Sequence, residues 1–237
     1  MINMELTKED LKFLYEIDNK ITGFGYEKDP RIEDIIDGRN EWRDLAYIFN
    51  CRENQISFYK NEITKDTICH NGNLFLYNLT SVENLNLPEI LRGYLDLSSL
   101  TSAEGLVLPK SIGDDLYLNS FTSPKGLILP KRIGGDLELR SLTSAEGLVL
   151  PKTVGTYLDL RSLTNIEGLI IPEPLTYNIK MYDFTITPEN VHEYRNNSKN
   201  NIKTISIYKK HLKPYVLKRI NKSIKINNEL DNKNTKL

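Results

Sequence analysis

Residue types that could carry out catalysis are few and widely separated in this chain. The three histidines, His70, His192 and His211, lie in different segments, and no helical His-x-x-x-His spacing occurs. Cys51 and Cys69 form no Cys-x-x-Cys pair, and on a strand the adjacent side chains of Cys69 and His70 would point to opposite faces. We therefore expect no catalytic residue, no metal site and no cofactor. An enzyme whose site is assembled in space by the terminal segments is the alternative that the local sequence leaves open.

One glycine-rich stretch has the residue types of a nucleotide site. Gly134-Gly135-Asp136-Leu137-Glu138 resembles the Gly-Gly-Asp-Glu signature of nucleotide cyclases. The equivalent positions read Gly113-Asp114-Asp115 one copy earlier and Gly155-Thr156-Tyr157 one copy later in a repeat described below. A glycine that recurs in this way indicates a tight turn. The nine-residue Gly-Gly-x-Gly-x-Asp calcium repeat is absent, so calcium is not expected either.

An internal repeat organises the middle of the chain. Pro88, Pro109, Pro130, Pro151 and Pro172 are each separated by 21 residues. Regular self-similarity of this length is typical of solenoids, in which each repeat is covered by its neighbours. The repeats are therefore expected to fold together as a stack.

Each copy of the repeat predicts two short strands. Leu95 alternates with Leu97 and Leu106 with Leu108, and alternation with a period of two over so few residues indicates strands. Stacking equivalent strands in parallel, about 4.8 Å apart, places their inward leucines in columns. The expected columns are Leu76, Leu97, Leu118, Leu139 and Leu160 on one side, Leu87, Leu108, Leu129, Leu150 and Ile171 on the other, and Leu79, Leu100, Phe121, Leu142, Leu163 and Phe184 at the corner.

The motif Leu-x-Leu-x-x-Leu-Thr-Ser-x-x-Gly-Leu-x-Leu-Pro, as at residues 95–109, resembles bacterial and phage-borne leucine-rich-repeat-like proteins. The resemblance covers about 110 of the 237 residues and implies an architecture, not an activity. Ordinary leucine-rich repeats carry asparagine where this chain has Leu100, Leu142 or Leu163. The expected fold is therefore mainly β: a parallel two-sheet β-solenoid, or leucine-rich-repeat-like array, of about five 21-residue rungs.

The segment before the repeat, residues 1–72, is expected to be an α-rich N-terminal cap. A helix over 7–21 should have Thr7 as its N-cap and Asp10 at the capping-box position. Further helices should begin at Pro30 and after Asn40, and residues 55–60 should form a strand leading to the first rung. A cap of this kind covers the strand edges at the end of a solenoid.

The solenoid itself should span 73–187, and residues 188–237 should form a basic C-terminal cap with a disordered tail. A helix is predicted at Thr187-Pro188, a strand at 203–208 and a helix at 211–226. Residues 227–237 are polar, and their deletion should leave the melting temperature nearly unchanged.

Charge is distributed unevenly along a chain whose formal net charge is −1. Residues 1–70 contain 15 acidic and 10 basic residues, and residues 196–237 contain 2 acidic and 11 basic residues, which gives net charges of −5 and +9. Lys218, Arg219 and Lys222 are therefore candidate contacts to nucleic acid. A solvated helix face explains the same lysines, because arginine, the better partner for phosphate, is scarce.

The chain shows no pattern of a targeting signal, and we therefore expect a cytoplasmic protein. The first residues show no basic stretch followed by an apolar run, no apolar segment reaches the ~20 residues of a membrane span, and two cysteines give no disulfide framework. Both cysteines are expected to be small buried apolar residues. For a phage-encoded protein the compartment would be the host cytoplasm.

Two surfaces of the expected solenoid could bind partners. The outward positions of the first strand are mixed in charge, and they place Glu138 beside Asp159. We predict that this face binds a macromolecule through Asp96, Tyr117, Glu138, Arg140, Asp159 and Arg161. The second candidate interface is an outward aliphatic column, which should be covered by a terminal segment or a second chain: Val107, Ile128, Val149 and Ile170.

The expected function is a non-enzymatic scaffold that binds a protein partner. The resemblance to phage-borne repeats suggests an alternative, an anti-CRISPR-like inhibitor that disables a host defence nuclease and uses the same face. The basic tail could then add nucleic-acid contacts. The sequence gives no oligomeric state.

Overall fold

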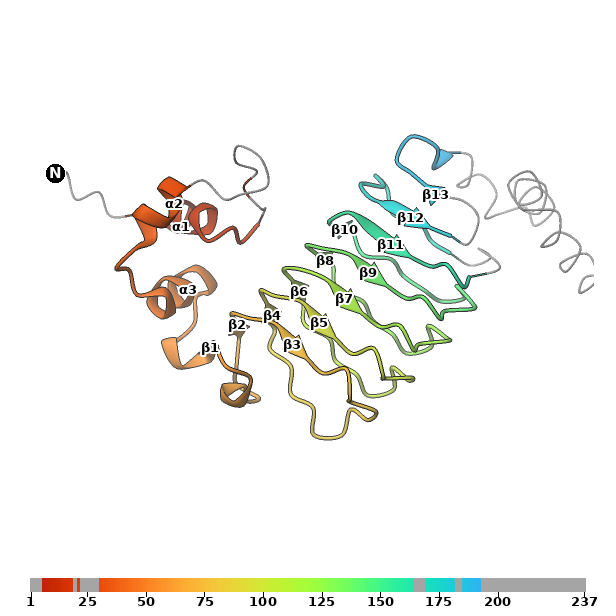
Figure 1. Ribbon diagram of the computed structural model, residues 1–237, viewed down its shortest axis with the longest axis horizontal. Helices are drawn as coiled ribbons and strands as arrows, with labels where there is room; N and C mark the ends of the chain where they lie inside the picture. Colours follow the sequence, from red (N-terminus) through yellow and green to blue (C-terminus); the bar gives the residue numbers. More distant parts are fainter. Residues whose placement is uncertain (1–5, 19–20, 22–29, 164–168, 182–184, 193–237) are drawn as a thin grey trace, which may run out of the picture.

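Two sheets of short strands run along the repeat region in the computed structural model of the chain (Figure 1). The structure describes residues 6–18, 21, 30–163, 169–181 and 185–192. Each turn of the coil, called a rung below, gives one strand to each sheet, and the fold is a mainly β solenoid of about five turns. Because the strands of adjacent rungs pair in parallel, residues 21 positions apart are hydrogen-bonded neighbours, as Leu95, Leu116 and Leu137 are.

Sheet A begins within the segment that precedes the repeat. Its order along the solenoid is β1 (Ile56–Ser57), β2 (Cys69–His70), β4 (Ile90–Leu91), β6 (Ser111–Ile112), β8 (Arg132–Ile133) and β10 (Thr153–Val154), all parallel. The strand predicted at 55–60 is therefore present as β1, and it belongs to the same sheet as the repeats. The short 3₁₀ helices η1 (Glu53–Gln55) and η2 (Lys60–Glu62) flank it.

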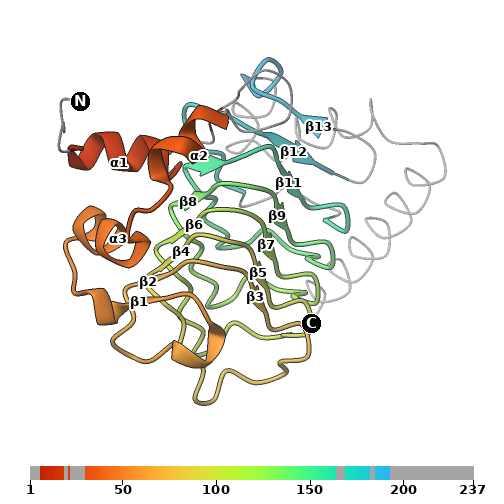
Figure 2. The same cartoon turned by 60° about the vertical axis from the view of Figure 1, so that its left-hand side comes forward.

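Sheet B contains the first of the two strands predicted for each copy. Its order is β13 (Thr185–Ile186), β12 (Asn178–Lys180), β11 (Tyr157–Asp159), β9 (Leu137–Glu138), β7 (Leu116–Tyr117), β5 (Leu95–Asp96) and β3 (Leu74–Phe75). Every pair is parallel except β12 with β13, which is antiparallel. Figure 2 shows the strands of sheets A and B as two adjacent columns.

The second strand of each rung lies later in the sequence than predicted. The segment Leu106–Leu108 is not assigned as a strand, and the strand of sheet A follows Pro109 as β6. Proline has no N–H to donate, and the rung-to-rung hydrogen bonds resume at the next residue, where the Lys110 N–H donates to the Glu89 carbonyl at 2.7 Å. The leucine alternation predicted which side chains face inward but not which backbone groups pair.

Glycines hold the rungs together at the turn between the two sheets. A Cβ on Gly134 would lie 2.1 Å from the carbonyl oxygen of Gly113, and one on Gly155 would lie 1.9 Å from that of Gly134. Any side chain at these positions would collide with the backbone of the rung before it. The recurring glycine of the Gly-Gly-Asp stretch is therefore a packing requirement of the turn, as its recurrence indicated.

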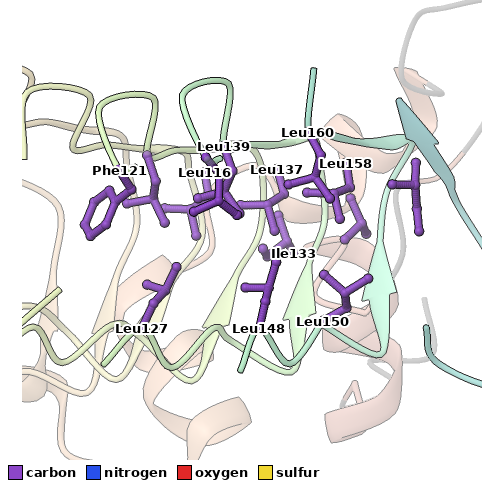
Figure 3. Packing of buried hydrophobic residues seen from close by; sticks show 14 of the residues in the cluster. Leu116, Phe121, Leu127, Ile133, Leu137, Leu139, Leu148, Leu150, Leu158 and Leu160 are labelled. Atoms are coloured by element: carbon purple, nitrogen blue, oxygen red, sulfur yellow. The ribbon is translucent and has the colours of Figure 1, made fainter. Parts of the chain in front are cut away.

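The core fills the inside of the coil. Figure 3 shows inward side chains of sheet B, including Leu116, Leu137 and Leu158, facing Leu127, Leu148 and Leu150 from the opposite wall. The predicted column from Leu76 to Leu160 is buried, and the corner column is buried from Leu100 to Leu163. Leu79, Leu87, Leu108, Leu129 and Ile171 are only partly buried, and Phe184 lies outside the described residues.

In the described residues, three helices precede sheet A: α1 (Lys8–Leu14), α2 (Pro30–Ile36) and α3 (Glu41–Phe49). Thr7 caps α1 and forms the predicted capping box with Asp10, but the helix ends well before residue 21. Asn40 caps α3 as predicted, and the left-handed Asn50 ends it. Helix residues pack with β1 and β2 in a second apolar cluster that consists of Leu11, Tyr15, Leu45, Ala46, Ile48, Ile56 and Cys69.

At the other end, the helix predicted at Thr187-Pro188 appears in the described residues mainly as a turn over 188–191. The Asn190 side chain caps this turn by accepting a hydrogen bond from the Thr187 N–H. The predicted strand at 203–208 and helix at 211–226 lie outside the described residues.

Candidate functional site

The outer face of sheet B carries most of the residues predicted to bind a partner. Because each inward leucine is followed by an outward residue, one column of side chains runs across this face. The strand register aligns the column in this order: Phe75, Asp96, Tyr117, Glu138, Asp159 and Lys180. The predicted set thus falls on one continuous surface, and its two ends differ in chemistry.

The end nearer β3 is aromatic. The rings of Phe75 and Tyr94 meet edge to face with centroids 4.8 Å apart, and Tyr94 meets Tyr117 in the same way at 6.1 Å. Phe75 and the nearby Tyr77 are each more than half exposed. The sequence prediction included Tyr117 but missed these three other aromatics. The period-two alternation of the strands could have identified them, because Phe75, Tyr77 and Tyr94 alternate with inward leucines.

The end nearer β11 consists of buried carboxylates under arginines. Glu138 and Asp159, which were predicted as outward contact residues, retain only 6% and 1% of their accessible surface and are not available for direct contact. Arg140 donates to both, with its Nε 3.2 Å from an Asp159 carboxylate oxygen and its Nη2 bonded to Glu138. Arg161 donates to Asp159 through Nη2 at 2.7 Å. The arginines cover the acids and offset their mutual repulsion.

The guanidinium groups remain accessible above those acids. The side chains of Arg140 and Arg161 are about half exposed, at 45% and 51%. The Asp159 carboxylate raises the pKa of Arg161 further above its already high value. Asn119 donates to Oε2 of Glu138 at 2.9 Å, and Arg140 donates to Oε1, so both carboxylate oxygens have a donor. Arg140 and Arg161, and not the acids, are therefore the charged groups that a partner could contact.

Asx side chains join the rungs beside this face. Oδ1 of Asn73 accepts from the Tyr94 N–H at 3.0 Å, and Oδ1 of Asp115 accepts from the Asp136 N–H at 2.7 Å. Each bond spans 21 residues and links one rung to the next. Asp115 also accepts from the hydroxyl of Tyr117 at 2.7 Å, which raises the pKa of that tyrosine. The outer face is therefore fixed to the turn beside it.

The strands of the N-terminal segment bring together a serine and a histidine that the sequence separates by 13 positions. The Ser57 hydroxyl lies 2.9 Å from Nδ1 of His70, because β1 and β2 pair these residues. Both side chains are about 99% buried, and burial lowers the pKa of His70. A substrate could not reach this pair without opening the segment. We interpret it as a satisfied buried hydrogen bond.

The cysteines divide between buried and partly exposed. Cys69 is buried as predicted, and burial raises the pKa of its thiol to about 12. Cys51 is only partly buried, and the prediction that both cysteines are buried was therefore wrong for this one. Among the residues that the structure describes, no three His, Cys, Asp or Glu side chains are grouped so as to hold a metal ion.

The predicted aliphatic column is exposed. Val107, Ile128, Val149 and Ile170 are 81%, 80%, 64% and 65% exposed. No described part of the chain covers them, and the C-terminal segment after residue 192, which belongs to one of the two covers predicted from the sequence, lies outside the described residues. The candidate nucleic-acid residues Lys218, Arg219 and Lys222 lie outside the described residues.

Comparisons of the chain with protein-family models, with curated proteins and with solved structures find no match. Within the described residues, no helix is both long enough and apolar enough to cross a membrane.

Proposed function

We propose that this protein is a non-enzymatic scaffold that binds another protein through the outer face of sheet B. The observation that carries the proposal is the combination of exposed, mutually packed aromatics with two half-exposed arginines on one continuous sheet surface. Tyrosine, phenylalanine and arginine are enriched in the centres of protein interfaces, where they supply most of the binding energy. Solenoids commonly use such extended faces for binding.

The arginines suit this role because they are already held in place. Binding usually costs side-chain entropy, and long charged side chains lose the most. Arg140 and Arg161 are restrained by hydrogen bonds to Glu138 and Asp159 before any partner arrives. Their remaining N–H groups favour a partner that presents carboxylates. The partner surface should therefore be acidic at one end and apolar at the other.

The test is affinity capture from the native host followed by mass spectrometry, with matched variants. Phe75→Ser combined with Tyr94→Ser removes the aromatic end. Asp159→Asn combined with Arg161→Gln removes the half-exposed guanidinium of Arg161 without leaving a buried carboxylate unpaired. Tyr59→Ser is the control, because Tyr59 is exposed and lies outside sheet B. The proposal requires a protein that wild type and control capture and that both face variants lose.

Capture that is the same for every variant, with unchanged melting curves, would contradict the proposal. The alternative of a phage-encoded inhibitor of a defence nuclease stays a prediction from the sequence. It differs in the identity of the partner, so the captured protein would also decide between the two.

A further inference from the structure

Sheet B begins one strand later than sheet A, because the turn of the coil before it is short. The paired residues of β1 and β2 are 13 positions apart, whereas those of β2 and β4, and of every later rung, are 21 apart. Residues 58–68, all within the described part of the chain, form η2 and turns but no strand. This turn is therefore eight residues shorter than a full rung and adds no strand to sheet B before β3.

The backbone of β3 consequently has one paired edge and one open edge. On the paired edge, the Leu74 N–H donates to the Tyr94 carbonyl at 2.9 Å. The Leu76 N–H donates in the same direction, to the Asp96 carbonyl at 2.9 Å. Because successive residues of a strand point their N–H and C=O groups to opposite sides, those of Phe75 point away from β5, and no described residue bonds to them. One rung later, Asp96 occupies the equivalent position in a strand that is paired on both sides.

The open edge lacks the devices that usually protect an edge strand. Such strands commonly carry charged residues or proline, or are covered by another element. The first strand of sheet A is covered in this way, because Ile56 of β1 packs with Leu45 of α3. The segment that contains β3, residues 73–78, reads Asn-Leu-Phe-Leu-Tyr-Asn and has neither a charge nor a proline. Its outward side chains, Phe75 and Tyr77, are 56% and 52% exposed.

The core behind this edge is closed. Leu74 is 1% exposed, and Ile63 of the short turn packs against the same apolar cluster. The Glu62 carboxylate accepts from the N–H groups of Phe58 and Tyr59 at 3.0 and 3.1 Å and holds this turn compact. What remains open is backbone hydrogen bonding, which specifies the occupant as another extended main chain and not as a small ligand.

We propose that the β3 edge binds an extended segment of the partner protein, which adds to sheet B as a further strand beside Phe75. The Phe75 N–H donates to a carbonyl of that segment, and the Phe75 carbonyl accepts from one of its N–H groups. This inference rests on the proposed function, because it places a strand of the partner at the aromatic end of the same outer face. The segment's outward side chains lie beside Phe75 and Tyr77, where aromatic and β-branched residues pair well. The segment therefore alternates apolar residues and has no proline at the paired positions.

Amide hydrogen exchange of the full chain, followed by NMR, tests the open edge directly. In the free protein the Phe75 amide should exchange quickly, while the Asp96 amide at the equivalent position should be protected. A protected Phe75 amide in dilute solution would show that another segment of the chain already occupies the edge. Protection that appears only on concentration would show a second copy there. Either result would overturn the proposal.

The probe for binding is a displayed library of random peptides of about ten residues, the length of a long strand, selected on the full chain. Selected peptides should alternate apolar residues, and a bound peptide should slow exchange of the Phe75 amide by about tenfold or more. Peptides that bind without protecting this amide, or a library that yields no binder, would contradict strand addition.

Proline at residue 75 separates the backbone from the side chain. Phe75→Ala removes the ring and keeps the N–H, whereas Phe75→Pro removes both. Phe75→Pro should raise the Kd of a selected peptide by about tenfold or more relative to Phe75→Ala, because a carbonyl of the peptide loses its donor. The two variants should melt alike, since the lost N–H lies outside the β3–β5 ladder, whereas Asp96→Pro, the control within the ladder, should melt lower. Equal Kd values for Phe75→Pro and Phe75→Ala would refute the pairing, and the exchange measurements on the unaltered chain hold whether or not proline is tolerated.

Failure of this inference can be told from failure of the proposed function. A captured protein that depends on Arg161 but binds Phe75→Pro and Phe75→Ala equally well would leave the outer face as the binding surface and remove the added strand. Peptide pairing at Phe75, together with capture that ignores both face variants, would retain the strand and remove the outer face.

Discussion

Burial decides the protonation of His70. Its ring is 1% exposed, and removal from water disfavours the charged form, so the pKa lies below its ordinary value although Glu62 acts in the opposite direction. The neutral ring can accept from, or donate to, the Ser57 hydroxyl. An unfolded chain would protonate this histidine near pH 6.5.

The stability of the folded chain should therefore depend on His70 in mild acid. Because the folded pKa is lowered, the contribution of His70 is fully present above about pH 6.5 and is lost as pH falls through the folded pKa. His70→Asn should lose less stability than wild type between pH 7.5 and pH 5. Urea denaturation at both pH values measures this difference, and His192→Asn, at an exposed site, is the control. An identical pH dependence in wild type and His70→Asn would contradict the assignment.

Two kinds of glycine can be separated by substitution. Gly134 lacks room for a Cβ, whereas Gly147 has nothing within 4 Å but adopts a φ of +78°. Alanine at Gly147 should cost about 1 kcal/mol, and asparagine should cost less because it tolerates the left-handed region. At Gly134 both substitutions should cost about 1–3 kcal/mol, since each collides with backbone. Thermal melts of the four variants test this, and rescue by asparagine at Gly134 would argue against close rung contact.

At the scale of single residues, the period-two alternation of the sequence predicted which side chains point outward but not which of them are exposed to solvent. Glu138 and Asp159 do point away from the leucine core, as alternation requires. They are nevertheless buried, because Arg140 and Arg161 fold over them from two residues further along. The cover depends on rotamers and on the adjacent rung, which a linear pattern does not record. Replacing the acids with lysine would therefore test stability before it tested binding.

One arginine of the first rung adds polar contacts between the solenoid and the N-terminal helical segment. Arg92 occupies the repeat position that is Gly113, Gly134 and Gly155 in later rungs. Its Nη2 donates to the Tyr15 carbonyl at 2.6 Å, and its Nη1 contacts Asn71 at 2.7 Å and Glu41 at 3.3 Å. The departure from glycine thus marks where the repeat meets the helical segment.

Removing this arginine should loosen the helices without unfolding the rungs. Arg92→Ala removes the arginine that donates to the Tyr15 carbonyl and to Glu41, of which Glu41 still accepts from Asn71 at 2.8 Å, and should cost about 1–3 kcal/mol. Limited proteolysis should then cut within α1 or α3 sooner than within the repeats. Arg43→Ala is the matched control, because its ion pair with Glu53 is exposed and contributes little. Equal proteolysis of Arg92→Ala and wild type would show that apolar packing alone holds the helices.

At the scale of elements, the capping signals and the first strand of each copy were predicted correctly, whereas the second strand was not. Thr7 and Asn40 begin their helices as predicted, since a side-chain cap is a local interaction. The strands of sheet A were displaced past Pro109 and its equivalents, because pairing depends on the neighbouring rung. Leu106 and Leu108 face inward on a wall that is held mainly by side-chain packing.

The molecule as a whole is built from contacts between successive rungs. Each rung buries its leucines between two others, and the register repeats at 21 residues in both sheets. Stability in such an array approximates a sum of rung and neighbour contributions. The repeat in the sequence therefore predicted the architecture, whereas the exposure and contacts of the surface side chains could be seen only in the structure.

The length of the repeat gives a strict test of this view. Deleting residues 115–135 removes 21 residues and joins Asp114 to Asp136, so every later column keeps its position and Leu137 replaces Leu116 above Leu95. The shortened protein should fold with the same circular dichroism per residue and a lower melting temperature, because one rung of buried leucines is lost. Deleting residues 115–134 instead removes 20, and a slip of one residue turns each following inward leucine outward. That variant should fail to fold or should lose its later rungs. If both deletions melted alike, the rungs would not be in the register that the sheets define.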